Sequence, residues 1–418
     1  MPTYYINSGS GNDSSGDGSQ GSPYKTLGKV LDVIENTSAD VIVEITDEET
    51  YPEHSLIYRP GFPASLTIRH TASHLGRPKF DATGAGTNMQ FINFDGVHIA
   101  TSNVTASIIG IEIETNNAAD FFDGTFNNGL EFHISGCFLY GARALLGSFN
   151  RSARPVSTIK QSILFFDDDG AGGDMIQAQN GLEISNCLLT SSAGFGEILK
   201  GTAGFGSNNV TASFCTIISR RTNQQAAAVS RWGKLINCVV SSSGPGVQSD
   251  DHSFNLVIGT GGGSGGNDTY SFIDSSGNPT SLGTGDIKAY PTFVNGAPIG
   301  NSPSIAANFA LAEGSRGIDE GVAYDSILVD ITGTVRPQGI GFDMGAFERL
   351  APYWQDADGS ETYSRKFGGG FEIHGTTNRL ATRSFPSLMS NRQAPYFVTI
   401  PGPANLRTRP TPYKVEKE

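Results

Sequence analysis

A short apolar pattern recurs between residues 130 and 258, each time around one small or thiol-bearing position. In each copy an alternating apolar and polar run meets a second, more continuous apolar run at a Cys or Ser residue. These marker positions are separated by 25, 25, 28 and 23 residues, and they are Cys137, Ser162, Cys187, Cys215 and Cys238. A period of this length is typical of repeat proteins, in which each unit buries its apolar face against its neighbours.

Each repeat predicts short β-strands joined by turns rich in Gly, Ser, Asn and Asp, without the 3.6-residue period of a helix. This pattern excludes βαβ units and predicts an all-β fold, a parallel β-helix in which like residues stack about 4.8 Å apart. Ser162 then occupies a column of small residues that is otherwise Cys. Less regular strands are expected earlier in the chain, around residues 41–45, 66–68, 91–94, 97–99 and 109–113.

A single amphipathic helix is predicted before the repeats. Pro23 is expected to open it, and Leu27, Val30, Leu31 and Ile34 have the spacing of one apolar face. Such a helix would cover the open end of the coil, whose free strand edge could otherwise pair with other chains. We therefore predict three regions: a strand, polar loop and capping helix over 1–36, a parallel β-helix over 37–349, and an extended segment over 350–418.

Composition and net charge limit the kinds of partner that we expect for this chain. Gly accounts for 53 of 418 residues, which suits a fold with a turn at every corner. The net charge of −13 and the pI of about 5.0 argue against nucleic acid as a partner. No run approaches the ~18 apolar residues of a membrane span. Residues 1–6 form a strand pattern rather than a signal peptide, so an extracellular role would need leaderless export, removal of a leader or release by lysis, whereas a virion protein would assemble in the host cytoplasm.

The C-terminal segment differs from the rest of the chain. Residues 351–418 are rich in Pro and carry a net charge of +3, against −16 for the remainder. This asymmetry predicts a segment that binds a partner, although a flexible tail has the same composition. The residues expected to contact the partner are Tyr396, Phe397, Ile400, Arg407, Arg409 and Tyr413.

The four Cys residues are expected to be buried free thiols. Stacked positions about 4.8 Å apart exceed the usual ~3.5–4.5 Å between the Cβ atoms of a disulfide. No Cys-x-x-Cys or His pattern accompanies them that would indicate a metal site.

Candidate chemistry is sparse. Asp167, Asp168, Asp169 and Asp174 form the densest acidic cluster, which could hold Ca²⁺ through Asp167 and Asp169 or supply catalytic carboxylates through Asp167, Asp168 and Asp174. The same composition is typical of a solvated turn.

Two further groups of side chains are candidates for function. Arg220, Arg221 and Arg231 could bind acidic sugars from adjacent repeats, or could simply offset neighbouring acids. His252 is a possible acid/base group, although we expect it to be exposed in a loop.

Both ends of the repeat region resemble right-handed parallel β-helix proteins of the pectate-lyase-like superfamily. The resemblance covers about residues 3–348. At the start of the chain it rests on Tyr5-Ile-Asn with its polar loop and on Ser22-Pro-Tyr-Lys-Thr-Leu, and at the far end on residues 291–295, 309–311, 314–321, 330–339 and 342–348. It implies a fold more than a function, since this fold serves lyases, hydrolases and viral spikes. The Gly-His-Gly segment of the hydrolases is absent from the sequence, and so is an Arg-x-Lys beside paired Asp residues.

Two function classes follow from the resemblance. The first is a structural virion protein of a tailed bacteriophage, a decoration or spike-like subunit that forms homotrimers, binds capsid or tail proteins through its C-terminal segment, and contacts surface polysaccharide. It needs no cofactor. The alternative is an extracellular polysaccharide lyase or glycoside hydrolase acting in a lateral groove, with Ca²⁺ as the cofactor if it is a lyase.

Overall fold

The computed structural model divides the chain into two compact units. Unit 1 comprises Met1–Thr71 and Gly76–Arg349, and unit 2 comprises Ala72–Leu75 and Leu350–Glu418. The structure describes residues 1–35, 37, 39–54, 56–58, 65–70, 76–84, 90–94, 104–115, 120–123, 126–127, 130–141, 146–150, 157–166, 175–178, 181–191, 197–201, 210–219, 228–242, 246–259, 281–294, 309–349, 354–355, 361–367 and 371–377.

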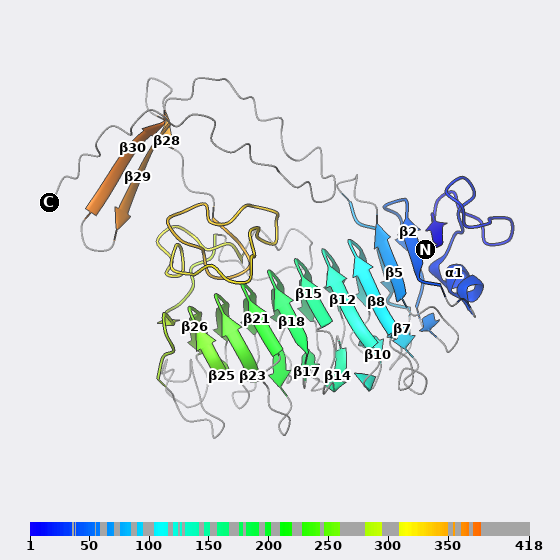
Figure 1. The fold of residues 1–418 in the computed structure, drawn as a ribbon, viewed down its shortest axis with the longest axis horizontal. Helices are drawn as coiled ribbons and strands as arrows, with labels where there is room; N and C mark the ends of the chain where they lie inside the picture. The colour runs from blue at the N-terminus through cyan, green and yellow to red at the C-terminus, as the bar shows by residue number, and fades with distance from the viewer. Residues whose placement is uncertain are drawn as a thin grey trace. The chain divides into compact units, whose positions relative to one another are not determined.

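Two long parallel sheets, of 17 and 10 strands, form unit 1 (Figure 1). This architecture is compatible with the expected β-helix solenoid. The strand pairings divide the larger sheet into two ladders. The first ladder contains β1 (Thr3–Ile6), β2 (Val41–Ile45), β5 (Ser65–His70), β8 (Val104–Ile109), β12 (Leu130–Ser135), β15 (Ser157–Lys160), β18 (Leu182–Ser185), β21 (Val210–Ser213), β23 (Val229–Ile236) and β25 (Val247–Ser253).

The second ladder joins the first at β23. It contains β4 (Leu56–Tyr58), β7 (Gln90–Phe94), β10 (Asp120–Asp123), β11 (Phe126–Asn127), β14 (Leu146–Asn150), β17 (Ile176–Ala178) and β20 (Leu199–Gly201). The smaller sheet contains β3 (Thr50–Tyr51), β6 (Lys79–Ala82), β9 (Glu112–Thr115), β13 (Phe138–Tyr140), β16 (Ile163–Phe166), β19 (Leu188–Ser191), β22 (Thr216–Ser219), β24 (Val239–Ser242), β26 (Leu256–Gly259) and β27 (Ile287–Lys288).

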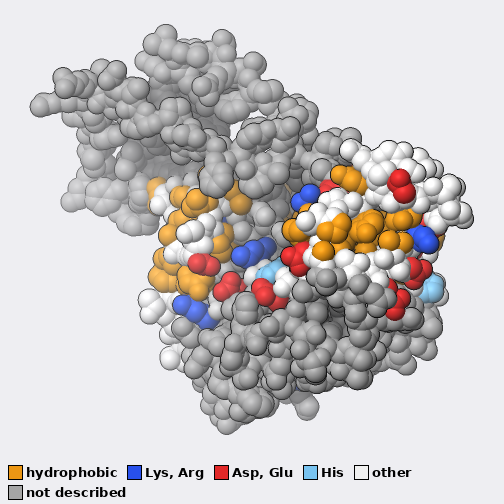
Figure 2. Space-filling view, turned by 45° about the vertical axis from the view of Figure 1, so that its right-hand side comes forward, with side chains coloured by type: hydrophobic (Ala, Val, Ile, Leu, Met, Phe, Trp, Pro, Cys, Tyr) orange, Lys and Arg blue, Asp and Glu red, His pale blue; other side chains and the backbone are white. Residues whose placement is uncertain are grey.

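The outward positions of the first ladder carry polar and charged side chains. The strand register aligns His133 with Thr158, Thr158 with Glu183, Glu183 with Thr211, and Thr211 with Lys234. Figure 2 shows acidic, basic and histidine side chains gathered on one face of the molecule. Because aligned residues of a parallel pair point the same way, this row forms a polar surface backed by the core.

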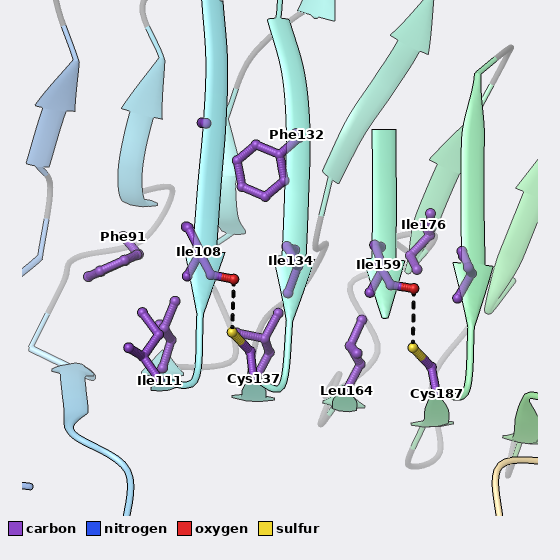
Figure 3. Packing of buried hydrophobic residues seen from close by; sticks show 14 of the residues in the cluster. Phe91, Ile108, Ile111, Phe132, Ile134, Cys137, Ile159, Leu164, Ile176 and Cys187 are labelled. Atoms are coloured by element: carbon purple, nitrogen blue, oxygen red, sulfur yellow. Dashed lines mark hydrogen bonds between the residues drawn. The ribbon is translucent and has the colours of Figure 1, made fainter. Parts of the chain in front are cut away.

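The inward positions form continuous apolar columns. Ile134 pairs with Ile108 on one side and Ile159 on the other, and all three are buried (Figure 3). The Sγ atoms of Cys137 and Cys187 donate to the carbonyls of Ile108 and Ile159 at 3.4 and 3.5 Å. Each of these thiols therefore hydrogen-bonds to a strand of the preceding repeat.

The predicted column of marker residues is confirmed by the strand register. Ser185 pairs with Ser213 and Leu188 with Thr216, so Cys187 aligns with Cys215. All four Cys residues are buried free thiols, as expected. Burial raises the pKa of the Cys137 and Cys187 thiols, so they remain protonated at neutral pH.

A second column contains the residue directly before each marker and the equivalent residue of three further repeats. Its residues have positive φ angles between 47° and 71°, and they are Gly110, Gly136, Gln161, Asn186, Phe214, Asn237, Phe254 and Gly285. This left-handed conformation costs a non-glycine residue roughly 1–2 kcal/mol. The backbone ladder offsets that cost, because the amide of Asn186 donates to Ser213 O and that of Phe214 to Ile236 O, each at 3.1 Å.

The N-terminal helix α1 spans Leu27–Ile34, and its four predicted apolar residues are all buried. It begins later than predicted. Thr26, rather than Pro23, caps the helix, and its hydroxyl accepts from Lys29 N at 3.1 Å. The helix contacts β1, β2 and β4 at the N-terminal end of the sheets (Figure 1).

Unit 2 contains a small antiparallel sheet of β28 (Trp354–Gln355), β29 (Glu361–Phe367) and β30 (Phe371–Thr377). We had predicted only an extended segment here. The sequence could have predicted this hairpin, because runs of alternating apolar and polar residues on both sides of Gly368-Gly-Gly370 are typical of one. Within the described residues, no helix has the length and apolar character needed to cross a bilayer.

Candidate functional site

We call residues 309–349 the closing segment. Part of it crosses the outer surface of the first ladder. Residues 322–330, which we call the arch, are tied down at both ends by the column of left-handed residues. Asn237 donates from Nδ2 to Val322 O at 2.7 Å and accepts from Val322 N at 3.0 Å. At the other end, Asn186 Nδ2 donates to Val329 O at 2.7 Å. The arch therefore spans several repeats.

A cavity of about 240 Å³ lies where the arch crosses the strands, and we call it the arch pocket. Strands β15, β18 and β21 supply one side, and residues 324–329 supply the other. The lining residues are Lys160, Gln161, Glu183, Ser185, Asn186, Thr211, Ser213, Tyr324, Asp325, Ser326, Ile327, Leu328 and Val329.

The sheet side of the pocket presents polar groups that are not used elsewhere. The side chains of Lys160, Glu183 and Thr211 have no hydrogen-bond or ion-pair partner among the residues that the structure describes. Lys160 is exposed, and Glu183 and Thr211 are half-buried. These groups offer both donors and acceptors to a ligand.

The arch itself holds two non-glycine residues in the left-handed region. Asp325 and Ser326 have φ angles of 48° and 55°. Each such residue stores on the order of 1–3 kcal/mol, and strained residues of this kind cluster at ligand-binding sites. The conformation persists because the arch is anchored at both ends.

Polar contacts extend along the sheet on both sides of the pocket. Lys234 Nζ lies 5.1 Å from the centroid of the Tyr324 ring, a cation–π distance. The His133 ring lies 2.9 Å from Thr158 Oγ1 through Nδ1 and 2.8 Å from Glu131 Oε1 through Nε2. Both nitrogens are thus engaged, so His133 is held in place by its neighbours.

The remainder of the closing segment contains a buried ion pair. Arg336 Nη1 lies 3.1 Å from Glu348 Oε2, and both side chains are fully buried. Arg336 also donates to the carbonyls of Asp343 and Gly345 at 3.0 and 2.8 Å. Its guanidinium lies 4.5 Å from the centroid of the Phe214 ring, which belongs to the left-handed column. The pair therefore holds the closing segment together, and Arg336 links the segment to the sheet.

The acidic side chains around this pair accept from main-chain amides. Asp343 accepts from Asp319 N at 2.8 Å and from Arg349 N at 2.7 Å. Asp330 accepts from Thr334 N at 2.7 Å and from Glu348 N at 2.9 Å. Burial, and then the neighbouring Glu348 charge, raises the pKa of Asp343 to about 7.

His252 lies elsewhere than predicted. It belongs to β25, not to an exposed loop, and it aligns with the buried Leu235 at the last position of an inward column. Its Nδ1 lies 2.5 Å from Asp286 Oδ2, and the Asp286 side chain is fully buried. Asp286 Oδ1 also accepts from Asn255 N and Asn255 Nδ2, at 2.9 and 3.0 Å. These contacts close the C-terminal end of the core.

The sequence-predicted site residues fall largely outside the described residues. This applies to the acidic cluster, to two of the three arginines and to the whole C-terminal set: Asp167, Asp168, Asp169, Asp174, Arg220, Arg221, Tyr396, Phe397, Ile400, Arg407, Arg409 and Tyr413. Arg231 lies in β23, but its side chain is also outside that set. These assignments remain predictions.

The arch pocket was missed because its two sides are more than 100 residues apart in sequence. Glu183 and Thr211 occupy equivalent outward positions of successive repeats, and Lys160 lies two residues beyond the equivalent position of the repeat before them, so the repeat pattern could have identified this side of the pocket. The part of the chain that the structure describes contains no group of three or more His, Cys, Asp or Glu side chains suited to a metal ion. No known protein family matches the sequence, and no curated protein matches it.

Proposed function

We propose that this chain is a structural β-solenoid subunit of a tailed-bacteriophage particle, of the decoration or spike-like kind. In this proposal the coil is a right-handed β-helix of the pectate-lyase-like type, and α1 caps its N-terminal end. The basic C-terminal segment attaches the subunit to capsid or tail proteins, and three copies associate. Its place is therefore the virion, after assembly in the host cytoplasm.

The observation that carries the proposal is the use of the buried carboxylates. Asp286, Asp330, Asp343 and Glu348 all accept hydrogen bonds from main-chain amides that would otherwise be unsatisfied. All four residues are also buried, so these carboxylates stabilise loops and are closed off from a substrate in solution. The acidic groups buried at the closed end thus support a protein built for rigidity, which favours a structural subunit over the alternative of a polysaccharide lyase or hydrolase.

The charge distribution supports the attachment role. The segment from residue 351 to 418 has a net charge of +3 and follows a body with a net charge of −16. Opposite charge on two parts of one chain favours a partner that is acidic where the segment binds.

The test is co-sedimentation of the full-length protein with purified tailed-phage particles. We expect binding by the wild type and loss of binding when Arg407 and Arg409 are both changed to Glu. The matched control is Arg316→Glu, which reverses an exposed charge in unit 1. Equal binding of the two variants would remove the attachment role. Release of new sugar ends from a surface polysaccharide would instead establish the enzyme alternative.

A further inference from the structure

We propose that the arch pocket binds a single neutral sugar residue of a larger glycan. This inference goes beyond the structural role and does not depend on it. It rests on the size of the cavity, the chemistry of its lining, its balance of charge and the way in which its walls are held.

The size of the cavity limits the ligand to about one ring. Pockets for drug-sized molecules have volumes of roughly 300–1,000 Å³, and the arch pocket, at about 240 Å³, falls just below that range. A longer glycan would therefore place one residue in the pocket and continue along the polar outward row of the first ladder.

The chemistry of the lining suits hydroxyl groups. Each sugar hydroxyl both donates and accepts, so its site needs acceptors beside donors. Glu183 supplies acceptor oxygens, Lys160 supplies three N–H donors, and Thr211 supplies a hydroxyl that can do either. Tyr324, on the arch, adds an aromatic ring of the kind that covers the apolar C–H face of a sugar.

The charges at the pocket favour a neutral ligand. Lys160, Glu183 and Asp325 line it, and Lys234 lies against Tyr324 at its edge, so two positive charges balance two negative ones. A uronic acid would add a third negative charge to a site whose own charges already balance, so its carboxylate would compete with Glu183 and Asp325 for the two lysines. The pocket therefore selects against the acidic sugars that the arginine cluster suggested.

The walls of the pocket are fixed before any ligand arrives. The sheet side consists of hydrogen-bonded parallel strands, and the arch is fastened through Asn186 and Asn237. A site held in this way loses little conformational entropy on binding, so a few hydrogen bonds suffice for measurable affinity.

Titration calorimetry on the full-length protein tests the proposal. The probes are glucose, galactose, mannose and N-acetylglucosamine as neutral sugars, and galacturonate as the acidic comparison. We expect at least one neutral sugar to bind, and to bind at least tenfold more tightly than galacturonate. If no neutral sugar binds, or if galacturonate binds more tightly, the proposal is wrong.

Two variants locate the site. Glu183→Gln should weaken binding about tenfold or more, because hydrogen bonds to a charged group are the stronger ones, and Thr211→Val should weaken it by about two- to tenfold. Their controls are Glu320→Gln, at an exposed carboxylate outside the pocket, and Thr67→Val, at a similar outward position of β5.

Both pocket residues point away from the core, so the four variants should unfold at the same temperature as the wild type. Binding that is equally strong in the pocket variants and the controls would place the sugar elsewhere. That result would overturn this inference and leave the particle role standing.

Discussion

The two ends of the parallel sheets are packed by different chemistry. At the N-terminal end, α1 buries four aliphatic side chains beside β1, β2 and β4, and the loop before it pairs with β1 through Tyr5 N to Gly18 O and Tyr24 N to Tyr5 O. At the C-terminal end, the inward column ends in His252, and Asp286 and Asn255 satisfy the last polar groups. The apolar face of α1 dominates the first end, whereas at the second end a buried polar network lies beside a smaller apolar cluster that includes Leu256, Leu311 and Met344.

This difference predicts different responses to substitution. Apolar burial is non-directional, so a truncated side chain loses area and leaves a cavity whose cost depends on how far the neighbours relax. A buried polar network has fixed partners, so removing one member leaves the others unsatisfied at full desolvation cost. The closing segment, with its buried ion pair, is the extreme case.

Arg336→Ala should have the largest effect of any single substitution discussed. It leaves the Glu348 carboxylate buried without its cation and the carbonyls of Asp343 and Gly345 without a donor, which costs about 3–5 kcal/mol. The measurement is the urea midpoint of unfolding, followed by circular dichroism. Arg316→Ala removes an exposed ion pair with Glu320 and should cost less than about 1 kcal/mol. Equal costs for the two would mean that the buried pair does not fasten the segment.

Leu31→Ala tests the apolar end. The side chain is 4 % exposed within the core cluster, so its truncation should cost about 2–5 kcal/mol. Limited proteolysis should then cut first within the N-terminal 40 residues. The matched control is Asp32→Ala, on the exposed side of the same helix, which should change stability by less than about 0.5 kcal/mol. Both substitutions introduce Ala, the best helix former, so a similar loss in both variants would contradict the assignment of the cost to the packing of Leu31.

Asp286→Asn tests the polar end while nearly preserving side-chain volume. An amide can still accept from Asn255, but its nitrogen cannot accept from Gly283 N or from a His252 Nδ1–H group. The substitution should lower the free energy of unfolding by about 1–3 kcal/mol. We expect amide hydrogen exchange in β25 and β26 to become faster as a result. If exchange there is unchanged while the urea midpoint falls, the network does not secure the last repeat.

Much of the fold could be predicted from sequence because a repeat enforces its own register. The spacing of Cys137, Ser162 and Cys187 located the turns. The prediction of which residues of α1 are buried was correct at all four positions. The left-handed conformations of Phe214 and Phe254 were not predictable, since large side chains disfavour positive φ and only the neighbouring strands impose it. The arch pocket could not be predicted from the sequence either, because its position depends on where residues 322–330 cross the sheet.

The smallest predicted effect is a pH dependence confined to the closing segment. Asp343 has its pKa raised to about 7 in the folded protein, against an ordinary value of 3.8, and burial raises the pKa of Glu348 in the same direction. Between pH 3.8 and about pH 7, Asp343 in the folded state therefore holds a proton that the unfolded chain has released. The contribution of Asp343 is therefore fully present below pH 3.8 and is lost as the pH rises through 7, at no more than about 1.4 kcal/mol per pH unit.

The urea midpoint should accordingly fall between pH 6 and pH 8, and Asp343→Asn should make that fall shallower because the amide does not titrate. Histidine residues also change charge in this range, so the informative quantity is the difference between the two slopes. Asp32→Asn, at an exposed position of α1, is the control and should keep the wild-type slope. If Asp343→Asn also keeps it, the carboxyl is already ionised at pH 6, and its bonds to Asp319 N and Arg349 N outweigh the cost of its burial.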